Sequence, residues 1–315
     1  SNISILIFQN NLNLVFFLQL FLKGYKSMKA IIQSALNQAK LTDIQMPTFS
    51  PISLEIETKY APLLRYDLLK LNGTITTTSP QIMGYGGTGA VTRVGSLRSN
   101  SLLHQKVLVL NPWGTFQEKI ISNIPPLVIP IPDNVALKEA TALVGGADLA
   151  LTLFKIIKQK DKQVLIYGAD SVTGLVLMQL LTRHTDINFI PHVRAISKTY
   201  LNERMDEYNI KIAPNIRTNS RLIIDLAGPA INEKLFKHFA HGDEIITVAQ
   251  KNTPGMQFIS RPALPKDYQF LMNEIQEKRL FIPINRTFSY QDFQSAIIFQ
   301  QNNPSRGRNL ISFID

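Results

Sequence analysis

Hydrophobic and polar positions divide the chain into segments of different period. Between Met28 and about Pro132, short apolar or alternating runs are separated by clusters of Pro, Gly, Ser and Asn; the clearest runs are KAIIQ, SLEIETKYA, GAVTRVG and KVLVLN. Runs of this length and spacing predict β-strands in a small barrel or a pair of sheets. The next segment, PDNVALKEATALVGGADLALTLFKII, changes to helical periodicity, with Ala140, Leu143 and Val144 on one face, and we predict a helix there.

Strands and helices alternate from residue 163 to about residue 250. The strand-like runs are QVLIYGA, NFIPHV, RLIIDLAG and EIITVAQ, and the helical segments between them are VTGLVLMQLLTRH, KTYLNERMDEYNI and INEKLFKHFAHG. Nearly continuous apolar strands, each followed by a helix, predict an α/β domain with a doubly wound parallel sheet covered on both faces. Gly242 suits a helix C-terminus. Pro191 lies inside a predicted strand and removes a backbone donor, so we expect a bulge or a strand end there.

The remainder of the chain adds two helices and two strands. YQFLMNEIQEKRL and QDFQSAIIFQQ have helical periodicity, and FIPINRTFSY and RNLISFI are strand-like. The chain has 315 residues, 45% of them hydrophobic and 18% charged. This composition predicts a globular protein of two domains with a sizeable core.

Net charge and cysteine content limit the kinds of binding partner and the cellular compartment that we expect. Lys and Arg number 33 against 23 Asp and Glu, a net charge of +10, but no run of five basic residues occurs. We therefore expect a dispersed basic surface and no nucleic-acid partner, since nucleic-acid binding would rest on net charge alone. The chain has no cysteine, which excludes disulfides, thiolate nucleophiles and cysteine-ligated zinc. The same absence fits a reducing compartment, and we expect a cytoplasmic protein.

Residues 1–27 form an apolar extension before MKAIIQSAL. Its longest apolar run, Leu14 to Leu22, is nine residues, about half of what a membrane-spanning helix needs. The first lysines, Lys23 and Lys26, follow this run instead of preceding it as in a secretory signal. We interpret residues 1–27 as an upstream extension or an expression remnant and expect no membrane association. The alternative is a short amphipathic helix that docks on the body or on a partner chain.

The segment GADSVTG, residues 168–174, connects a predicted strand to a predicted helix. Gly174 stands at the position where a nucleotide-binding turn needs close packing of helix and strand, and Ala169 and Ser171 stand at the first two glycine positions of that pattern. Both are small, and a serine hydroxyl can bond a phosphate oxygen. The helix N-terminus from Val172 offers free N–H groups. We therefore predict a dinucleotide site made by Ala169, Asp170, Ser171, Val172, Thr173 and Gly174.

The residue twenty positions after Gly174 is Arg194, followed by Ser197 and Lys198, and no carboxylate occurs until Glu203. An acidic residue there would bind the ribose 2′-hydroxyl of NAD. A cationic pair instead matches a 2′-phosphate through charge-assisted hydrogen bonds. We predict that Arg194, Ser197 and Lys198 contact the cofactor and that the cofactor is NADPH. The alternative is that Arg194 is only a surface arginine.

The order of several segments resembles the medium-chain dehydrogenase/reductase superfamily, in its zinc-independent quinone oxidoreductase-like branch. The resemblance runs from Met28 to the C-terminus and is carried by MKAIIQSA, YDLLKLNG with Asp67, MGYGGTGAVTRVG, IPDNVALKEATAL, RLIIDLAGPAINEKLFKHFAHGDEIITVAQ and FSYQDFQSAIIFQQNNPSRGRNLISF. It implies a GroES-like β-barrel domain from residues 28–147 and 287–315, and a Rossmann NADP-binding domain from residues 148–286. An active cleft at their junction, a small-molecule substrate and a homodimer are also implied. Within that arrangement we expect Ala227 and Ala249 to contact the cofactor.

Departures from that superfamily concern its zinc sites. Zinc-dependent members carry a cysteine three residues before the aspartate, where this chain has Leu64, and a His-Glu pair where it has Tyr85-Gly86. Their second zinc lobe needs four cysteines. None of the five histidines pairs with a second ligand at metal spacing. We therefore expect no zinc and no other metal.

The catalytic groups depart from the resemblance as well. Ile75 stands where a tyrosine is usual, and Leu149-Ala150 where threonine-alanine is usual. Tyr85 and Tyr66 lie on segments that should line the cleft, and either phenol could supply a proton; for Tyr66 a core or surface role is the alternative. With Ile75, two further residues are expected at the substrate pocket. Trp113 either walls it or plugs the core, and Asp148 either caps a helix or relays a proton.

These observations predict an NADPH-dependent, zinc-independent oxidoreductase. It would reduce a carbonyl, a quinone or an activated alkene by hydride transfer from the nicotinamide. The alternative is a catalytically weak nucleotide-binding member of the superfamily that acts as a sensor or partner protein.

Overall fold

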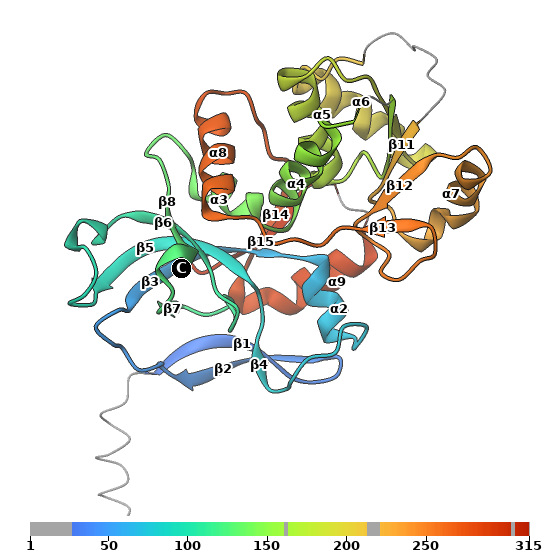
Figure 1. The fold of residues 1–315 in the computed structure, drawn as a ribbon. Helices are drawn as coiled ribbons and strands as arrows, with labels where there is room; N and C mark the ends of the chain where they lie inside the picture. The colour runs from blue at the N-terminus through green and yellow to red at the C-terminus, as the bar shows by residue number, and fades with distance from the viewer. Residues whose placement is uncertain (1–26, 161–162, 213–220, 304–305, 315) are drawn as a thin grey trace, which may run out of the picture.

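The structure is a computed structural model that describes residues 27–160, 163–212, 221–303 and 306–314. The predicted extension therefore lies outside the described residues, apart from Ser27. Within the described part, the chain forms a β-rich region and a region of helices around a parallel sheet (Figure 1). The two regions meet at the helices that follow residue 136.

The β-rich region contains two sheets. One has the order β2-β1-β4, from β1 (Ser27–Ala35), β2 (Gln38–Gln45) and β4 (Gln81–Ile82). The other has the order β14-β15-β3-β5-β6-β8, with β7 (Lys119–Ser122) also paired to β3. Its strands are β3 (Leu54–Leu63), β5 (Gly86–Val94), β6 (Lys106–Leu110), β8 (Val128–Pro130), β14 (Ile284–Ser289) and β15 (Arg308–Ser312). An apolar cluster that includes Ile31, Leu63 and Ile311 joins the two sheets.

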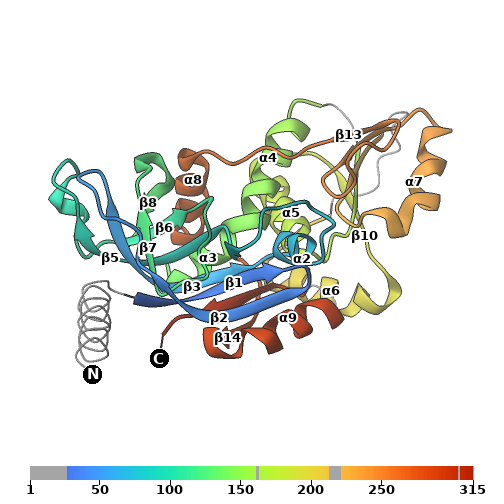
Figure 2. The same ribbon diagram turned by 90° about the horizontal axis from the view of Figure 1, so that it is seen from below.

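The last strands of the chain thus belong to the first region of the chain. β15 pairs antiparallel with β3, with Asn309 opposite Leu63, and β14 lies outside β15. β14 begins at Ile284, slightly before residue 287, where the sequence predicts the return to the barrel. Helix α9 (Phe293–Asn302) connects these two strands along the chain and lies next to β14 (Figure 2).

The second region is built on a five-stranded parallel sheet with the order β10-β9-β11-β12-β13. Alternate strand residues reach opposite faces, so Ile223 packs toward α7 and Ile224 toward the cluster that contains α4 and α5. Both faces are covered, which explains the nearly continuous apolar strands and confirms the doubly wound layout. The strands are β9 (Gln163–Tyr167), β10 (Phe189–His192), β11 (Arg221–Asp225), β12 (Glu244–Thr247) and β13 (Met256–Phe258).

Most predicted helices are confirmed. Helix α5 (Val172–His184) matches its predicted segment, because Ser171 caps it and ten of its thirteen residues are buried. The others are α4 (Asp148–Ile157), α6 (Lys198–Glu207), α7 (Asn232–Phe239) and α8 (Pro265–Gln276). Helix α2 (Arg65–Leu71) lies in a segment predicted to be strand-like and was not predicted. Gly242, in the left-handed conformation at φ 72°, follows the end of α7 as predicted.

The helical segment predicted after Pro132 is confirmed, but a kink that the sequence does not predict divides it into two helices. Helix α3 (Leu137–Ala142) ends at a kink, in which Val144 is extended and Gly145 has φ 71°, before α4 begins at Asp148. A side chain at Gly145 would lie 2.8 Å from Leu64, and one at Gly86 would lie 2.8 Å from Val144. Contacts with β5 and with the start of α2 therefore hold the kink, and local periodicity carries no trace of them.

A further local finding concerns Pro191 in strand β10. Of the two outcomes expected at Pro191, the structure shows a strand end and no bulge: β10 pairs in register with β9 and ends one residue after Pro191. Among the described strands β10 lies at the sheet edge, where a missing donor is tolerated.

One described run, Leu137–Ile157, is long and apolar enough to cross a membrane, but two thirds of its most apolar window is buried and the kink divides it. It is a core segment at the junction of the two regions.

Candidate nucleotide-binding cleft

The turn between β9 and α5 has the geometry of a phosphate-binding turn. Gly168 adopts φ 80°, and the Ser171 side-chain oxygen accepts a hydrogen bond from the Gly174 N–H at 3.1 Å. A side chain at Gly174 would lie 2.6 Å from the carbonyl oxygen of Ala169. Gly174 therefore has the packing role that the sequence predicts. The tight turn itself is made by Gly168, one residue before the position that the pattern assigns to it.

A hollow of about 400 Å³, named here the Arg194 hollow, opens beside this turn. Its walls come from the turn, the ends of β9, β10 and β11, helix α2 of the β-rich region, and helix α7. Because parallel strands direct their carboxyl ends to one edge, this is the edge where a doubly wound sheet binds its ligand. The residues that line it are Arg65, Tyr167, Gly168, Asp170, Ser171, His192, Val193, Arg194, Leu226, Ala227, Ala230, Ile231 and Lys234.

Four of the residues predicted to bind cofactor line this hollow: Asp170, Ser171, Arg194 and Ala227. Ala169, Val172, Thr173 and Gly174 are buried behind it in the turn and the first turn of α5. Ser197 is fully buried, and Lys198 and Ala249 are exposed without lining the hollow. The structure therefore brings the turn, Arg194 and Ala227 together, and keeps Ser197, Lys198 and Ala249 outside the lining.

Arg308, which the sequence analysis did not select, lies next to the N-terminus of α5. A side chain at Gly146 would lie 2.6 Å from the Arg308 Nη2 atom and 2.9 Å from Val172, the first residue of α5. Arg308 is only 8% exposed, and its Nε atom has no hydrogen-bond partner among the described residues. Burial lowers the pKa of its guanidinium to about 10, against the opposing charges of Asp148 and Asp67. A buried cation with an unsatisfied donor beside a helix N-terminus suits an anionic ligand.

Asp67, at the start of α2, is a buried carboxylate whose charge acts on Arg308. It is 3% exposed and accepts a hydrogen bond from the Leu64 N–H at 2.8 Å, which caps the start of α2. Burial raises its pKa from 3.8 to about 6, although Leu64, Lys70, the Gly84 backbone and Arg308 favour the charged form. The aspartate that the sequence resemblance singled out is therefore a buried group that titrates close to neutral pH.

The two tyrosines predicted as proton donors lie near each other. Burial raises the pKa of the half-buried Tyr85, and the charges of Asp148 and Tyr66 add to this rise. Tyr66 is 44% exposed and lies under the Lys70 ammonium, whose Nζ is 4.6 Å from the ring centroid. Tyr85 thus holds its proton more firmly than an exposed tyrosine, as a general acid must until a substrate oxygen develops negative charge.

Asp148 is a capping residue, as the first of its two predicted roles states. Its carboxylate accepts hydrogen bonds from the backbone N–H groups of Gly145, Gly146 and Leu149 at 3.0, 2.8 and 2.7 Å. It accepts a fourth, at 2.7 Å, from the hydroxyl of Tyr268 on α8. This carboxylate therefore fastens the kink between α3 and α4, and it lies close enough to Tyr85 to affect its pKa.

The remaining predicted pocket residues lie on loops. Trp113 is 64% exposed, so the suggestion that it plugs the core is wrong. Ile75 is half-buried, and its N–H donates to the Leu69 carbonyl at 2.9 Å, directly after α2. Within the described residues, no group of three or more His, Cys, Asp or Glu side chains converges as metal ligands would.

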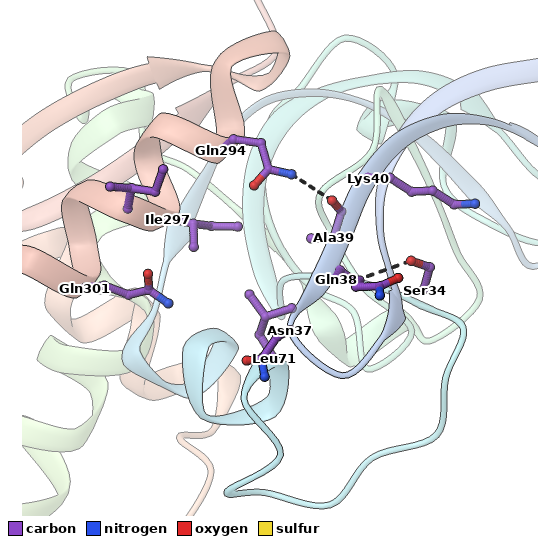
Figure 3. A pocket seen from close by; sticks show the side chains of 10 residues that line it. Ser34, Asn37, Gln38, Ala39, Lys40, Leu71, Gln294, Ile297 and Gln301 are labelled. Atoms are coloured by element: carbon purple, nitrogen blue, oxygen red, sulfur yellow. Dashed lines mark hydrogen bonds between the residues drawn. The ribbon is translucent and has the colours of Figure 1, made fainter.

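A second hollow, of about 600 Å³, lies between the β1–β2 hairpin and α9 (Figure 3). Gln294 crosses it and donates to the Ala39 carbonyl at 2.7 Å. Its lining consists mainly of amide, hydroxyl and aliphatic side chains, with Lys40 as the one cation, and contains none of the predicted site residues. It therefore does not fit a dinucleotide as the Arg194 hollow does.

Solved structures of two oxidoreductases are similar to this architecture. Quinone oxidoreductase from Coxiella burnetii superposes with a TM-score of 0.76 at 19% identity, over 92% of this chain and 100% of that one. A thermostable alcohol dehydrogenase from Pyrobaculum aerophilum gives 0.73 at 16% identity, over 91% and 100%. This chain shares the two-region fold of that quinone oxidoreductase and that alcohol dehydrogenase. The predicted GroES-like barrel and Rossmann sheet are thereby confirmed.

A further match was solved with its cofactor. The structure described as short chain alcohol dehydrogenase rspB from Escherichia coli, complexed with NADH, superposes with a TM-score of 0.69 at 18% identity, over 91% of this chain and 99% of that one. The chain matches no protein-family model and no curated protein. The comparisons therefore show a shared fold, at identities too low to transfer an activity.

Sequence reasoning missed two cations that line the hollow, Arg65 and Lys234, and the buried Arg308 beside the start of α5. Arg308 carries a signal, since it is a basic residue that opens the apolar strand RNLISFI. Arg65 begins α2 and Lys234 lies within α7, and both look like ordinary surface residues in the sequence. Only the fold brings them to the hollow beside Arg194.

Proposed function

We propose that this protein is a zinc-independent oxidoreductase that uses NADPH to reduce a carbonyl, a quinone or an activated alkene. The observation that carries the proposal is the Arg194 hollow, in which the turn at Gly168 before the capped helix α5 and three cations without an ion-pair partner among the described residues converge. A dinucleotide combines an adenosine with phosphates, and this combination of donors fits one. The relatives of similar fold are named as quinone oxidoreductase and alcohol dehydrogenase.

The residues divide between the parts of such a cofactor. The N–H groups at the start of α5, the Ser171 hydroxyl and the orphaned guanidinium of Arg308 would hold the diphosphate. Arg194 would bind the 2′-phosphate, because the chain has no carboxylate at this position for the 2′-hydroxyl of NADH. Leu226, Ala227 and Ile231 would enclose the adenine from the other side.

Reduction also needs a proton, which this chain can supply from Tyr85. When bound, the nicotinamide supplies the hydride. Tyr85 would donate its phenolic proton to the oxygen of the reduced substrate, and solvent would replace that proton. Burial, together with the charge of Asp148, raises the pKa of Tyr85, so the phenol would stay protonated until the substrate oxygen gains charge. A metal Lewis acid has no ligand set here, since Leu64, Tyr85 and Gly86 stand where zinc-dependent members carry ligands.

Calorimetric titration with NADPH and NADH tests the cofactor assignment. We expect NADPH to bind at least tenfold more tightly, and Arg194→Ala to reduce NADPH affinity about tenfold while NADH affinity changes less than twofold. Lys237→Ala, which changes an exposed cation outside the hollow, is the matched control. Equal losses for both cofactors would remove the 2′-phosphate role of Arg194. Stopped-flow oxidation of bound NADPH by a panel of quinones, enals and aldehydes would then identify the substrate class.

A further inference from the structure

Three basic side chains from three different elements line the Arg194 hollow: Arg65 on α2, Arg194 after β10 and Lys234 on α7. All three are exposed, and none of them forms an ion pair or a side-chain hydrogen bond with another described residue. Asp170 is the one carboxylate in the lining. Like charges that converge without acidic partners repel one another, and a bound anion relieves that repulsion.

Lys234 and Arg194 line the same hollow from two elements, α7 and the loop after β10. His192, which directly precedes Val193 and Arg194, lines it as well. Burial lowers the pKa of His192, and the charges of His238 and Lys234 add to this effect.

We infer that Lys234 is a second ligand, beside Arg194, for the phosphate that distinguishes NADPH from NADH. This inference rests on the proposed function, because it presumes a phosphorylated adenosine in the hollow. A phosphate monoester carries about −1.5 to −2 charges at neutral pH, so a single guanidinium leaves part of its charge uncompensated. Arg194 and Lys234 together balance it, and Arg65 remains for the phosphates at the 5′ position.

Binding of two fragments of the cofactor distinguishes the 2′-phosphate position from the 5′ position, and the measurement requires no catalysis. Adenosine 2′,5′-bisphosphate and adenosine 5′-diphosphate carry the same groups, and they differ in where the second phosphate is attached. We expect the wild-type protein to prefer the 2′,5′ compound in isothermal titration calorimetry. Lys234→Ala should reduce that preference about fivefold to tenfold and change the affinity for adenosine 5′-diphosphate less than twofold.

Lys237 provides the matched control, since it lies on the same helix, is exposed and does not line the hollow. Lys237→Ala should leave both affinities within twofold of wild type. Equal effects of the two lysine substitutions, or an equal loss of both fragments in Lys234→Ala, would overturn the assignment of Lys234. If Arg194→Ala abolishes the preference and Lys234→Ala does not, the proposed use of NADPH stands and only Lys234 is excluded. A wild-type protein without any preference would overturn both.

Discussion

Asp67 and Arg308 are opposite charges buried in the same part of the molecule, without an ion pair between them among the described contacts. Burial disfavours the charged form of each side chain, and the neighbouring groups offset this effect only in part. The pKa of Asp67 is therefore raised to about 6 and that of Arg308 is lowered to about 10. Burial of this kind costs folding free energy. Its cost is consistent with a site whose compensation comes from a ligand.

The raised pKa of Asp67 gives stability a specific pH dependence. Because the folded pKa of about 6 lies above the ordinary 3.8, the contribution of the neutral carboxyl is complete below pH 3.8 and is lost as pH rises through 6. At about 1.4 kcal/mol per pKa unit, wild type should lose up to about 3 kcal/mol of unfolding free energy over that window. Asp67→Asn should remove this loss and be the more stable protein at pH 7.5.

Urea denaturation at pH 4 and pH 7.5 measures this difference. Asp186→Asn, which changes an exposed carboxylate, should leave the pH dependence as in wild type. An Asp67→Asn protein that loses as much stability as wild type between the two pH values would show that another group is responsible.

Residue-level prediction from the sequence succeeded where the chemistry is local. Ser171 and Gly174 could be assigned because a cap and a close helix–strand contact depend on neighbours in the sequence. Arg65 and Lys234 could not, because they reach the hollow from elements about 170 positions apart. The burial of Asp67 was equally hidden, since nothing in YDLLKLNG indicates that its carboxylate faces inward.

At the scale of elements, the kink between α3 and α4 determines how the two regions join. It places Gly146 against Arg308 and Val172, and Gly145 against Leu64. The carboxylate of Asp148 fastens it through three backbone N–H groups and the Tyr268 hydroxyl. Helix α8 is thereby tied to the same joint, and it lies beside α3 in Figures 1 and 2.

Tyr268→Phe tests this tie. Because Tyr268 is 1% exposed and its hydroxyl donates to a carboxylate, its removal should lower the unfolding free energy by about 1–3 kcal/mol. Tyr200→Phe is the matched control, since the Tyr200 hydroxyl is buried without a partner among the described residues and its loss should cost nothing. Chemical denaturation of the three proteins at one pH gives the comparison, and similar values for both substitutions would contradict a stabilising role for the tie.

Elements were predicted well where a single amphipathic or apolar pattern fills a whole helix or strand. Helix α5 is an example, because its buried positions and its cap all lie within one segment. The kink at Val144 and Gly145 was missed because the apolar period continues through it. It is imposed by Leu64 and Gly86, which belong to other elements.

On the scale of the whole molecule, the barrel needs both ends of the chain. Strand β15 covers one edge of β3, and Phe288, Phe293 and Ile311 fill the core beneath. The parallel sheet of the other region lies entirely within residues 163–258. The two regions therefore depend on the C-terminal segment to very different degrees.

A chain that ends at Pro283 tests this difference. Without β14, α9 and β15, we expect residues 28–147 to be cleaved rapidly by trypsin, because β3 and its apolar neighbours lose their cover. The segment from about residue 148 to residue 283 should resist cleavage at least tenfold longer. Mass spectrometry of the fragments, with the full-length chain as control, provides the comparison. Protection of residues 28–147 in the shortened chain would show that the barrel closes without its last strands.

The pairing of Leu63 with Asn309 also determines how early the barrel can be completed during synthesis of the chain. About 250 residues separate the two partners, so at ~5–20 residues per second the ribosome needs roughly 12–50 seconds to deliver the second after the first. During that interval the parallel sheet can form behind an unfinished barrel, whose exposed strand edge is open to wrong partners. The nascent chain is thus most vulnerable to aggregation near its beginning, and it gains protection only with its final residues.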